Sequence, residues 1–285
     1  MDDLTTIINN LWMFLLVFFF LAPQIQRSLL NNARHGILQR IARTRGSNVI
    51  TLIHRQETIA FLGIPLSRYI DIDDSEEVLR AIRLTPPDTP IDIILHTPGG
   101  ILLAASQIAL ALNSHPAKKT VIVPHYAMSG GTLIAFAADE IVMDPHAVLG
   151  PVDPQLMEGN ASYPAVSLLR VIEKKKIDEV DDRTIILADE AKKAMSQNES
   201  LVRKILAGRH SDEIVNRIVD ELVSGKYTHD NAITADQASA IGLKVSTQVP
   251  SEVYDLMHFY RMGTMARRPG VEFVPVMPGG PRGRG

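Results

Sequence analysis

Apolar and polar positions follow the order strand, turn, helix through the middle of the chain, and this order occurs twice. Each expected strand is a short apolar run, each turn is rich in glycine, and each following helix is built from small apolar residues. In chain order we expect a strand at 91–95, a turn at 95–100, a helix at 101–112, a strand at 120–123, a turn at 125–131 and a helix at 132–138. This order predicts adjacent parallel strands that present both turns at one edge of a sheet.

The two turns carry residues suited to nucleophilic catalysis. Gly99 and Gly100 allow the backbone to approach a ligand closely, because glycine lacks a Cβ and tolerates positive φ. Ser129 stands at the start of the second helix, and Gly130 beside it keeps its amide accessible. We therefore predict Ser129 as a nucleophile. The amides of Gly99 or Gly100, together with that of Gly130, are the predicted oxyanion hole. The alternative is that Ser129 only caps a helix and the glycines only form turns.

Residues 91–155 resemble the Clp protease and signal peptide peptidase A group of serine peptidases. The segment 96–100 (His-Thr-Pro-Gly-Gly) is similar to the Asn-Ser-Pro-Gly-Gly oxyanion turn of that group, and 127–132 (Ala-Met-Ser-Gly-Gly-Thr) is similar to its nucleophile turn. The whole chain resembles the membrane-anchored branch called serine dehydrogenase proteinases. The resemblance implies an α/β fold, a Clp/crotonase-like spiral of β-β-α units. It also implies a polypeptide substrate and a homo-oligomer.

The N-terminal segment is strongly apolar. No charged residue occurs between Leu4 and Gln26, two aspartates precede this stretch, and five arginines follow it up to position 45. These features predict a transmembrane anchor at 1–26, with the N-terminus outside and the rest in the cytoplasm, at the cell (inner) membrane. The alternative is an apolar helix docked on the protein itself or on an oligomer partner. Residues 27–46 predict a basic amphipathic linker helix.

The remaining boundaries follow from composition. A peptidase domain is expected at 47–262, with a helix break near Asp181, and a disordered tail rich in proline, glycine and arginine at 263–285. A formal net charge of −3 argues against a nucleic-acid partner. The absence of cysteine excludes disulfides and thiolate chemistry. No histidine pair has metal-ligand spacing, so we expect neither a metal nor a cofactor.

The general base is the part of the site that the sequence leaves open. As general base, the Clp protease and signal peptide peptidase A group uses either a histidine paired with an acid or a lysine. In this chain Asp153 stands where a Clp-type histidine is expected. His229 lies in a loop before the closing helix, but the adjacent Asp230 is badly placed to orient it. We list Ser129, Asp153 and His229 as catalytic candidates. Further candidates for the base or the site are His96, His125 and the lysines at 174–176; His54, His115 and His258 are interpreted as structural or exposed.

Three functions fit these observations. The first is a membrane-anchored serine peptidase. The second is a crotonase-like acyl-CoA enzyme, because that fold also builds an oxyanion hole from two turns. The third is a membrane scaffold that kept the fold and lost the base. The serine in the second turn favours the peptidase, and the missing base keeps the scaffold open.

Overall fold

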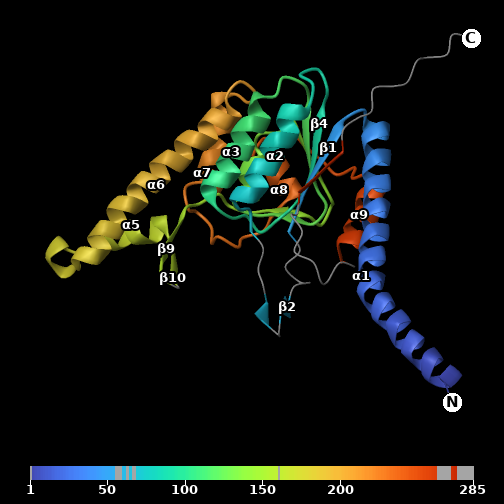
Figure 1. The fold of residues 1–285 in the computed structure, drawn as a ribbon. Helices are drawn as coiled ribbons and strands as arrows, with labels where there is room; N and C mark the ends of the chain where they lie inside the picture. Colours follow the sequence, from blue (N-terminus) through green and yellow to red (C-terminus); the bar gives the residue numbers. More distant parts are fainter. Residues whose placement is uncertain are drawn as a thin grey trace, which may run out of the picture.

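The computed structural model describes residues 2–54, 60–61, 64–65, 69–159, 161–261 and 271–274. Its centre is a six-stranded sheet in the order β12-β7-β5-β4-β1-β13 (Figure 1). The strands are β1 (Asn48–Ile53), β4 (Ile91–His96), β5 (Lys119–Val123), β7 (Glu140–Met143), β12 (Val245–Ser246) and β13 (Val271–Val274). All neighbours pair in parallel except β13, which is antiparallel to β1. β1, β4 and β5 are buried along their whole length, which explains their continuous apolar runs.

Helices cover both faces of this sheet (Figure 1). The body includes α2 (Ile72–Leu84), α3 (Leu102–Ser114), α4 (Gly130–Ala135), α7 (Asp212–Leu222) and α8 (Ala235–Ala240). Side chains from these helices share the larger apolar core with the strands. On the other face, Leu38 and Ile41 of α1 (Asp2–Arg45) and Leu256 of α9 (Ser251–Arg261) pack against Ile94 and Ile122 of the strands.

A second, smaller sheet lies at the ends of the central strands. It contains β6 (Tyr126–Ala127), β8 (Val148–Leu149) and β11 (Ile233–Thr234), in the order β11-β8-β6. β6 and β8 are parallel, and β11 is antiparallel to β8. The chain therefore runs from β5 through β6 into α4, which is the β-β-α order that the family resemblance implies, with β6 inside the segment predicted as a turn.

The N-terminal helix differs from the prediction of an anchor followed by a separate linker helix. α1 is one continuous helix of 44 residues. Part of the apolar stripe predicted for the linker packs on the sheet, because Ile37, Leu38 and Ile41 are buried there. Among the residues described, no helix is both long enough and apolar enough to cross a membrane. The predicted transmembrane anchor at 1–26 and single-pass localisation are therefore not supported.

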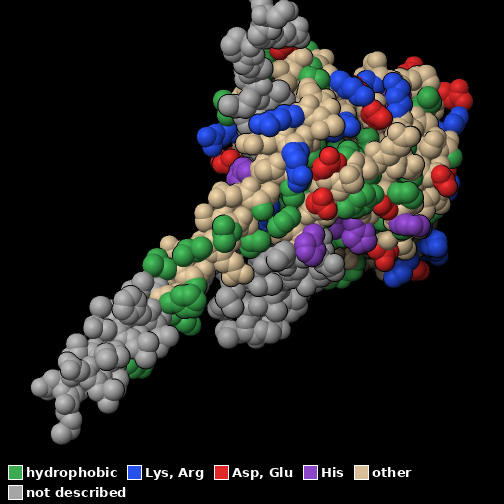
Figure 2. All heavy atoms as spheres, turned by 90° about the vertical axis from the view of Figure 1, so that its right-hand side faces the viewer, with side chains coloured by type: hydrophobic (Ala, Val, Ile, Leu, Met, Phe, Trp, Pro, Cys, Tyr) green, Lys and Arg blue, Asp and Glu red, His purple; other side chains and the backbone are tan. Residues whose placement is uncertain are grey.

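The rest of α1 projects from the body. Hydrophobic side chains are visible along this projecting part (Figure 2). Phe18, Phe19 and Phe20 are at least 64% exposed, and Leu29 is also exposed. The helix is anchored farther along by Arg34, whose guanidinium donates to the carbonyl of Phe259 in α9 at 2.8 Å.

A second projection extends from the opposite side of the body (Figure 1). It consists of the hairpin β9 (Gln155–Glu158) and β10 (Ala161–Pro164), then α5 (Ala165–Lys174), a short 3₁₀ helix (Ile177–Glu179) and α6 (Asp182–Leu206). The predicted helix break near Asp181 is confirmed, because Asp181 caps α6 by accepting a hydrogen bond from the amide of Thr184.

Two short elements complete the fold. β2 (Ala60–Phe61) and β3 (Ile64–Pro65) form an antiparallel pair.

The strand at 271–274 lies within the tail predicted to be disordered. Its alternating apolar residues allow it to extend the sheet at β1. The other residues of that predicted tail, 263–270 and 275–285, lie outside the described residues.

Candidate active site

The two glycine-rich turns lie side by side, as the sequence predicted. β4 and β5 are neighbouring parallel strands. Beyond their ends, the amide of Thr97 donates to the carbonyl of Tyr126 at 3.1 Å, and the amide of Met128 donates to the carbonyl of Thr97 at 2.9 Å. These two bonds extend the pairing of the chains past the strands. They bring the first turn into contact with the segment that leads to Ser129.

Ser129 occupies a strained position. Its backbone has φ +50° and ψ −114°, and it is the only non-glycine residue with positive φ in the described part of the chain. Such a conformation costs on the order of 1–3 kcal/mol and tends to occur at functional sites. The Ser129 side chain makes no capping hydrogen bond to α4. The interpretation of Ser129 as a helix cap is therefore not supported.

The first turn requires glycine at both positions for different reasons. Gly99 has φ +104°, and a Cβ there would lie 2.9 Å from the Cβ of Ser129. A Cβ on Gly100 would lie 2.3 Å from the carbonyl oxygen of Ile70. Ile70 pairs with this turn, since its amide donates to the carbonyl of Gly99 at 2.8 Å and its carbonyl accepts from Ile101 at 2.8 Å. The turn is thus held against both Ser129 and the segment before α2.

The backbone amides around Ser129 are not equivalent. The amide of Gly99 already donates to the Thr97 hydroxyl at 3.2 Å. Gly100 donates none of the backbone hydrogen bonds found among the described residues. Gly130 is the first residue of α4, where an amide has no acceptor within its own helix. Since the Gly100 nitrogen lies 3.6 Å from the position that a Cβ on Gly130 would take, the available pair is Gly100 and Gly130.

Asp153 and His229 form a hydrogen-bonded pair. Asp153 Oδ1 lies 2.7 Å from His229 Nδ1, and Asp153 Oδ2 accepts from Gln155 Nε2 at 2.6 Å. An ionised carboxylate only accepts, so Nδ1 of His229 carries the proton and Nε2 of a neutral imidazole remains an acceptor. The Asp153 side chain is buried and that of His229 is 35% exposed, so the imidazole edge faces outward from a buried acid.

The small sheet brings these three residues to one end. Ser129 follows β6 and Asp153 follows β8, and these strands are parallel. His229 precedes β11, which is antiparallel to β8, so its loop lies at the same end. A further contact closes the arrangement, because the amide of Gly150 donates to the hydroxyl of Thr132 in α4 at 3.0 Å.

The other base candidates have different surroundings. His96 is fully buried, with its ring 5.6 Å from that of His125 and 4.2 Å from that of Tyr126. His125 is exposed at the end of β5. The lysines at 174–176 are exposed at the end of α5, in the projection formed by α5 and α6. A lysine base requires desolvation to lower its pKa, and these lysines are open to water.

Sequence reasoning missed a buried cluster beside the first turn. His54, interpreted from the sequence as structural or exposed, lies with its Nε2 3.0 Å from Asp74 Oδ2 and its Nδ1 2.9 Å from Thr97 Oγ1. His54 is the first residue after the end of β1, and Thr97 is the first residue after the end of the neighbouring strand β4. The parallel pairing of β1 and β4 was the only available signal that His54 and Thr97 are neighbours.

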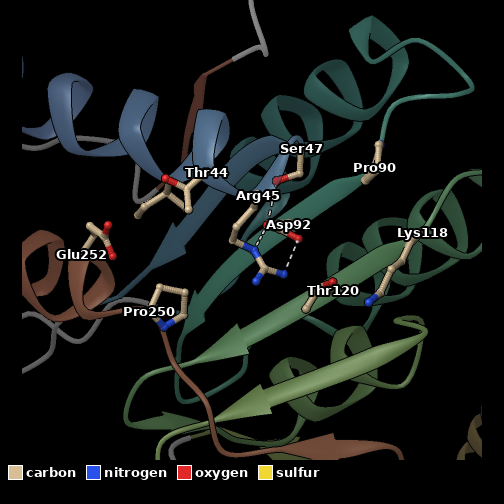
Figure 3. A pocket seen from close by; sticks show the side chains of 10 residues that line it. Thr44, Arg45, Ser47, Pro90, Asp92, Lys118, Thr120, Pro250 and Glu252 are labelled. Atoms are coloured by element: carbon tan, nitrogen blue, oxygen red, sulfur yellow. Dashed lines mark hydrogen bonds and ion pairs between the residues drawn. The ribbon is translucent and has the colours of Figure 1, made fainter.

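A pocket of about 430 Å³ lies at the opposite ends of the strands (Figure 3). Arg45 and Ser47 both point at Asp92 there, and both donate hydrogen bonds to its buried carboxylate. The pKa of Arg45 is raised by its hydrogen bond to Asp92, against the effect of burial. Arg45, Ser47 and Asp92 satisfy one another's hydrogen-bonding groups. We therefore interpret the pocket as a structural junction between α1 and the sheet, remote from Ser129.

Comparisons with known proteins agree with this architecture. The sheet with two adjacent glycine-rich turns is an α/β ClpP-like fold. The model of the family described as ClpP-like SDH-type serine proteinase matches residues 1–283. The chain therefore belongs to this family of serine peptidases, as its sequence resemblance indicated.

Two of the relatives found span nearly the whole chain, and a third matches a short part of it. Two uncharacterised proteins of Methanocaldococcus jannaschii are 51% and 48% identical over 276 residues, covering 96% of this chain and 95% and 92% of their own. A Haemophilus influenzae protein named "Probable protease SohB" is 36% identical over 81 residues, which is 27% of this chain and 23% of that protein.

Two solved structures match parts of this chain at low similarity. A mutant of the 1510-N membrane-bound stomatin-specific protease has a TM-score of 0.44 and 18% identity, covering 66% of this chain and 79% of its own. ClpP1 from Listeria monocytogenes has a TM-score of 0.45 and 14% identity, covering 75% and 98%.

Proposed function

We propose that this protein hydrolyses peptide bonds in polypeptide substrates, with Ser129 as nucleophile, His229 as general base and Asp153 as the acid that orients His229. The observation that carries this proposal is the 2.7 Å hydrogen bond between Asp153 and His229, at the end of the small sheet from which Ser129 also projects. Membership of a serine peptidase family supports the same assignment.

The proposed reaction begins with attack of Ser129 Oγ on the substrate carbonyl carbon. His229 Nε2 accepts the hydroxyl proton, while Asp153 holds the Nδ1 proton and stabilises the imidazolium that forms. His229 then donates its proton to the leaving amine. A water molecule, activated by the same imidazole, releases the second product from the acyl-enzyme. The residues named here suffice for this chemistry without a cofactor.

The oxyanion of each tetrahedral intermediate is assigned to the amides of Gly100 and Gly130. Both are backbone donors beside the nucleophile, and neither needs to move a side chain into place. Removal of one such donor typically costs about 3–4 kcal/mol of transition-state stabilisation. Gly99 is assigned a different role, because its amide is occupied by Thr97 and its lack of a side chain leaves room for Ser129.

The Asp153–His229 pair also bears on the alternatives. The absence of a recognisable base kept the scaffold function open, and in this proposal His229 of the pair is the base. An acyl-CoA enzyme needs no serine at the strained position of Ser129.

Assembly into a homo-oligomer is part of the proposal. Candidate contact surfaces are the exposed aromatic side chains at 18–20 of α1 and the exposed Met157 and Ile186 of the second projection.

Turnover of an unstructured polypeptide, such as fluorescently labelled casein, tests the proposal. Ser129→Ala is expected to lower kcat by at least about 10³-fold with an unchanged melting temperature, because only the nucleophile is removed. Ser114→Ala is the matched control, because the exposed hydroxyl of Ser114 donates to the carbonyl of Leu110 within α3. Equal turnover by Ser129→Ala and the native protein would refute the assignment.

A further inference from the structure

Behind the first turn, five residues form a closed ring of hydrogen bonds with Thr97. His54 bridges Asp74 at 3.0 Å and Thr97 at 2.9 Å, and the Thr97 hydroxyl accepts from the amide of Gly99 at 3.2 Å. The carbonyl of Gly99 accepts from the amide of Ile70 at 2.8 Å. The next residue, Asp71, donates its amide to Asp74 Oδ2 at 3.1 Å and closes the ring.

The chemistry of the side chains limits the directions that the hydrogen bonds of the ring can take. Asp74 only accepts when ionised, so His54 donates from Nε2 to it. The single proton of the Thr97 hydroxyl has two acceptors within reach, Nδ1 of a neutral His54 at 2.9 Å and the carbonyl of Gly99 at 3.3 Å. This leaves the lone pairs of Thr97 Oγ1 for the Gly99 amide. Side chains of His54 and Asp74 are only 2% and 6% exposed, so water does not compete strongly for these bonds.

We propose that His54, Asp74 and Thr97 are positioning residues that set the direction of the Gly100 amide. This inference rests on the proposed function, in which that amide is an oxyanion donor. The carbonyl of Gly99 and the amide of Gly100 belong to one planar trans peptide, so they point in opposite directions. A ring that holds the amide and the carbonyl of Gly99 therefore fixes the orientation of the Gly100 N–H.

The ring matters because the first turn is built from residues that restrict their own backbone very little. Both residues of the turn are glycines, which have the widest choice of backbone conformation. Thr97 reaches the ring from the end of β4, His54 from the end of β1, and Asp74 from the first turn of α2. Three rigid elements thus converge on one flexible peptide. A misplacement of about 1 Å at an active site can cost about 10²-fold in rate.

The test compares Thr97→Val with Thr97→Ser in the full-length protein. Valine keeps the shape of threonine without the hydroxyl, whereas serine keeps the hydroxyl. We expect Thr97→Val to lower kcat about 10- to 100-fold with little change in KM, and Thr97→Ser to stay within about threefold of the native rate. Equal kcat in a folded Thr97→Val protein would overturn the inference.

A second comparison separates positioning from general loss of stability. His54→Leu is paired with His115→Leu, since His115 is also buried and bonds through Nε2 to the carbonyl of Thr89 at 2.8 Å. Both variants are expected to lose stability, but only His54→Leu is expected to lower kcat at a temperature where both are folded. Equal kcat losses in the two variants would assign His54 a structural role only.

A readout independent of catalysis separates this inference from the proposed function. Amide hydrogen exchange at Gly99, measured by NMR, is expected to accelerate at least about tenfold in Thr97→Val and to change little in Thr97→Ser. Unchanged exchange in Thr97→Val would overturn the ring as a positioning device. Absence of polypeptide turnover by the native protein, with the expected exchange pattern, would instead refute the proposed function and leave the ring as a structural feature.

Discussion

His229 Nδ1 lies 2.7 Å from Asp153 Oδ1, although 76 residues separate the two in the chain. The acid is buried and receives a second hydrogen bond from Gln155, so it is fixed before any substrate arrives. This bond leaves Nε2 as the acceptor nitrogen of a neutral imidazole, and we propose that Nε2 is the general base. Ser129, on the neighbouring strand's turn, is the residue that this base would serve.

The first prediction concerns the acid. Asp153→Asn is expected to lower kcat by about 10²- to 10⁴-fold, because an asparagine amide can donate to Nδ1 and so favour the tautomer that blocks Nε2. Steady-state kinetics across pH measure this effect. Asp230→Asn is the control, since Asp230 adjoins His229 in sequence but the bond is made to Asp153. A greater loss in Asp230→Asn than in Asp153→Asn would contradict the pairing.

The second prediction concerns the packing of the first turn. Gly100→Ala places a Cβ 2.3 Å from the carbonyl oxygen of Ile70, so it is expected to destabilise the fold by about 2 kcal/mol or more. Gly36→Ala is the matched control, because that helical glycine has nothing within 4 Å of a new Cβ. It is expected to stabilise α1 by about 0.5–1 kcal/mol. Denaturant unfolding gives both values, and an equally stable Gly100→Ala protein would contradict the close approach to Ile70.

The third prediction concerns the opposite end of the sheet. Asp92→Ala removes a buried carboxylate from the partly buried guanidinium of Arg45, and the expected loss of stability is about 3 kcal/mol. Glu140→Gln breaks the exposed ion pair with Lys118 and is expected to cost less than about 1 kcal/mol. Chemical denaturation measures both. Because this end is remote from Ser129, kcat of the folded Asp92→Ala protein should be unchanged.

The fourth prediction is a dependence of stability on pH. Tyr254 donates to Asp144 at 2.5 Å, and burial together with this bond raises the pKa of Tyr254 to about 12. An unfolded tyrosine titrates near pH 10, so the contribution of this bond is complete below about pH 10 and is lost as the pH rises toward 12.

Asp144, the acid of the same pair, gives a pH dependence of stability with the opposite sign. Burial tends to raise the pKa of Asp144, but hydrogen bonds from Tyr254 and from the backbone of His146 outweigh it and lower that pKa. The stabilisation is therefore present above the usual aspartate range and is lost as the pH falls through the lowered pKa. Melting temperatures of the native protein and Tyr254→Phe should converge at both extremes. A constant difference from pH 3 to pH 12 would contradict this account.

Parts of the fold that depend on local pattern were predictable from the sequence. The strands before both turns, the glycines and the helix break near Asp181 each have a short-range signal, because turn chemistry and capping involve residues a few positions apart. The adjacency of the two turns followed from the strand–turn–helix order. The serine could be placed at a turn, but its strained φ of +50° has no sequence signature.

Long-range pairings were not predictable in the same way. His229 stands next to Asp230 in sequence, and nothing local indicates that Asp153 is its partner. His54 looked isolated for the same reason, since its contacts with Thr97 and Asp74 arise from strand pairing and from the placement of α2. In α1, an apolar stripe predicts burial but not its environment, and Leu38 and Ile41 pack on the sheet. The strand at 271–274 likewise depends on the free edge of β1.

The measurement that tests the central claim most directly is fluorophosphonate labelling of the native protein, Ser129→Ala and His229→Ala, analysed by intact mass. The account predicts one covalent adduct on the native protein, none on Ser129→Ala, and labelling of His229→Ala slowed by at least about 10²-fold, because the serine loses its base. His146→Ala, which alters an exposed histidine in a turn, should label at the native rate. Labelling of His229→Ala as fast as the native protein would contradict the account.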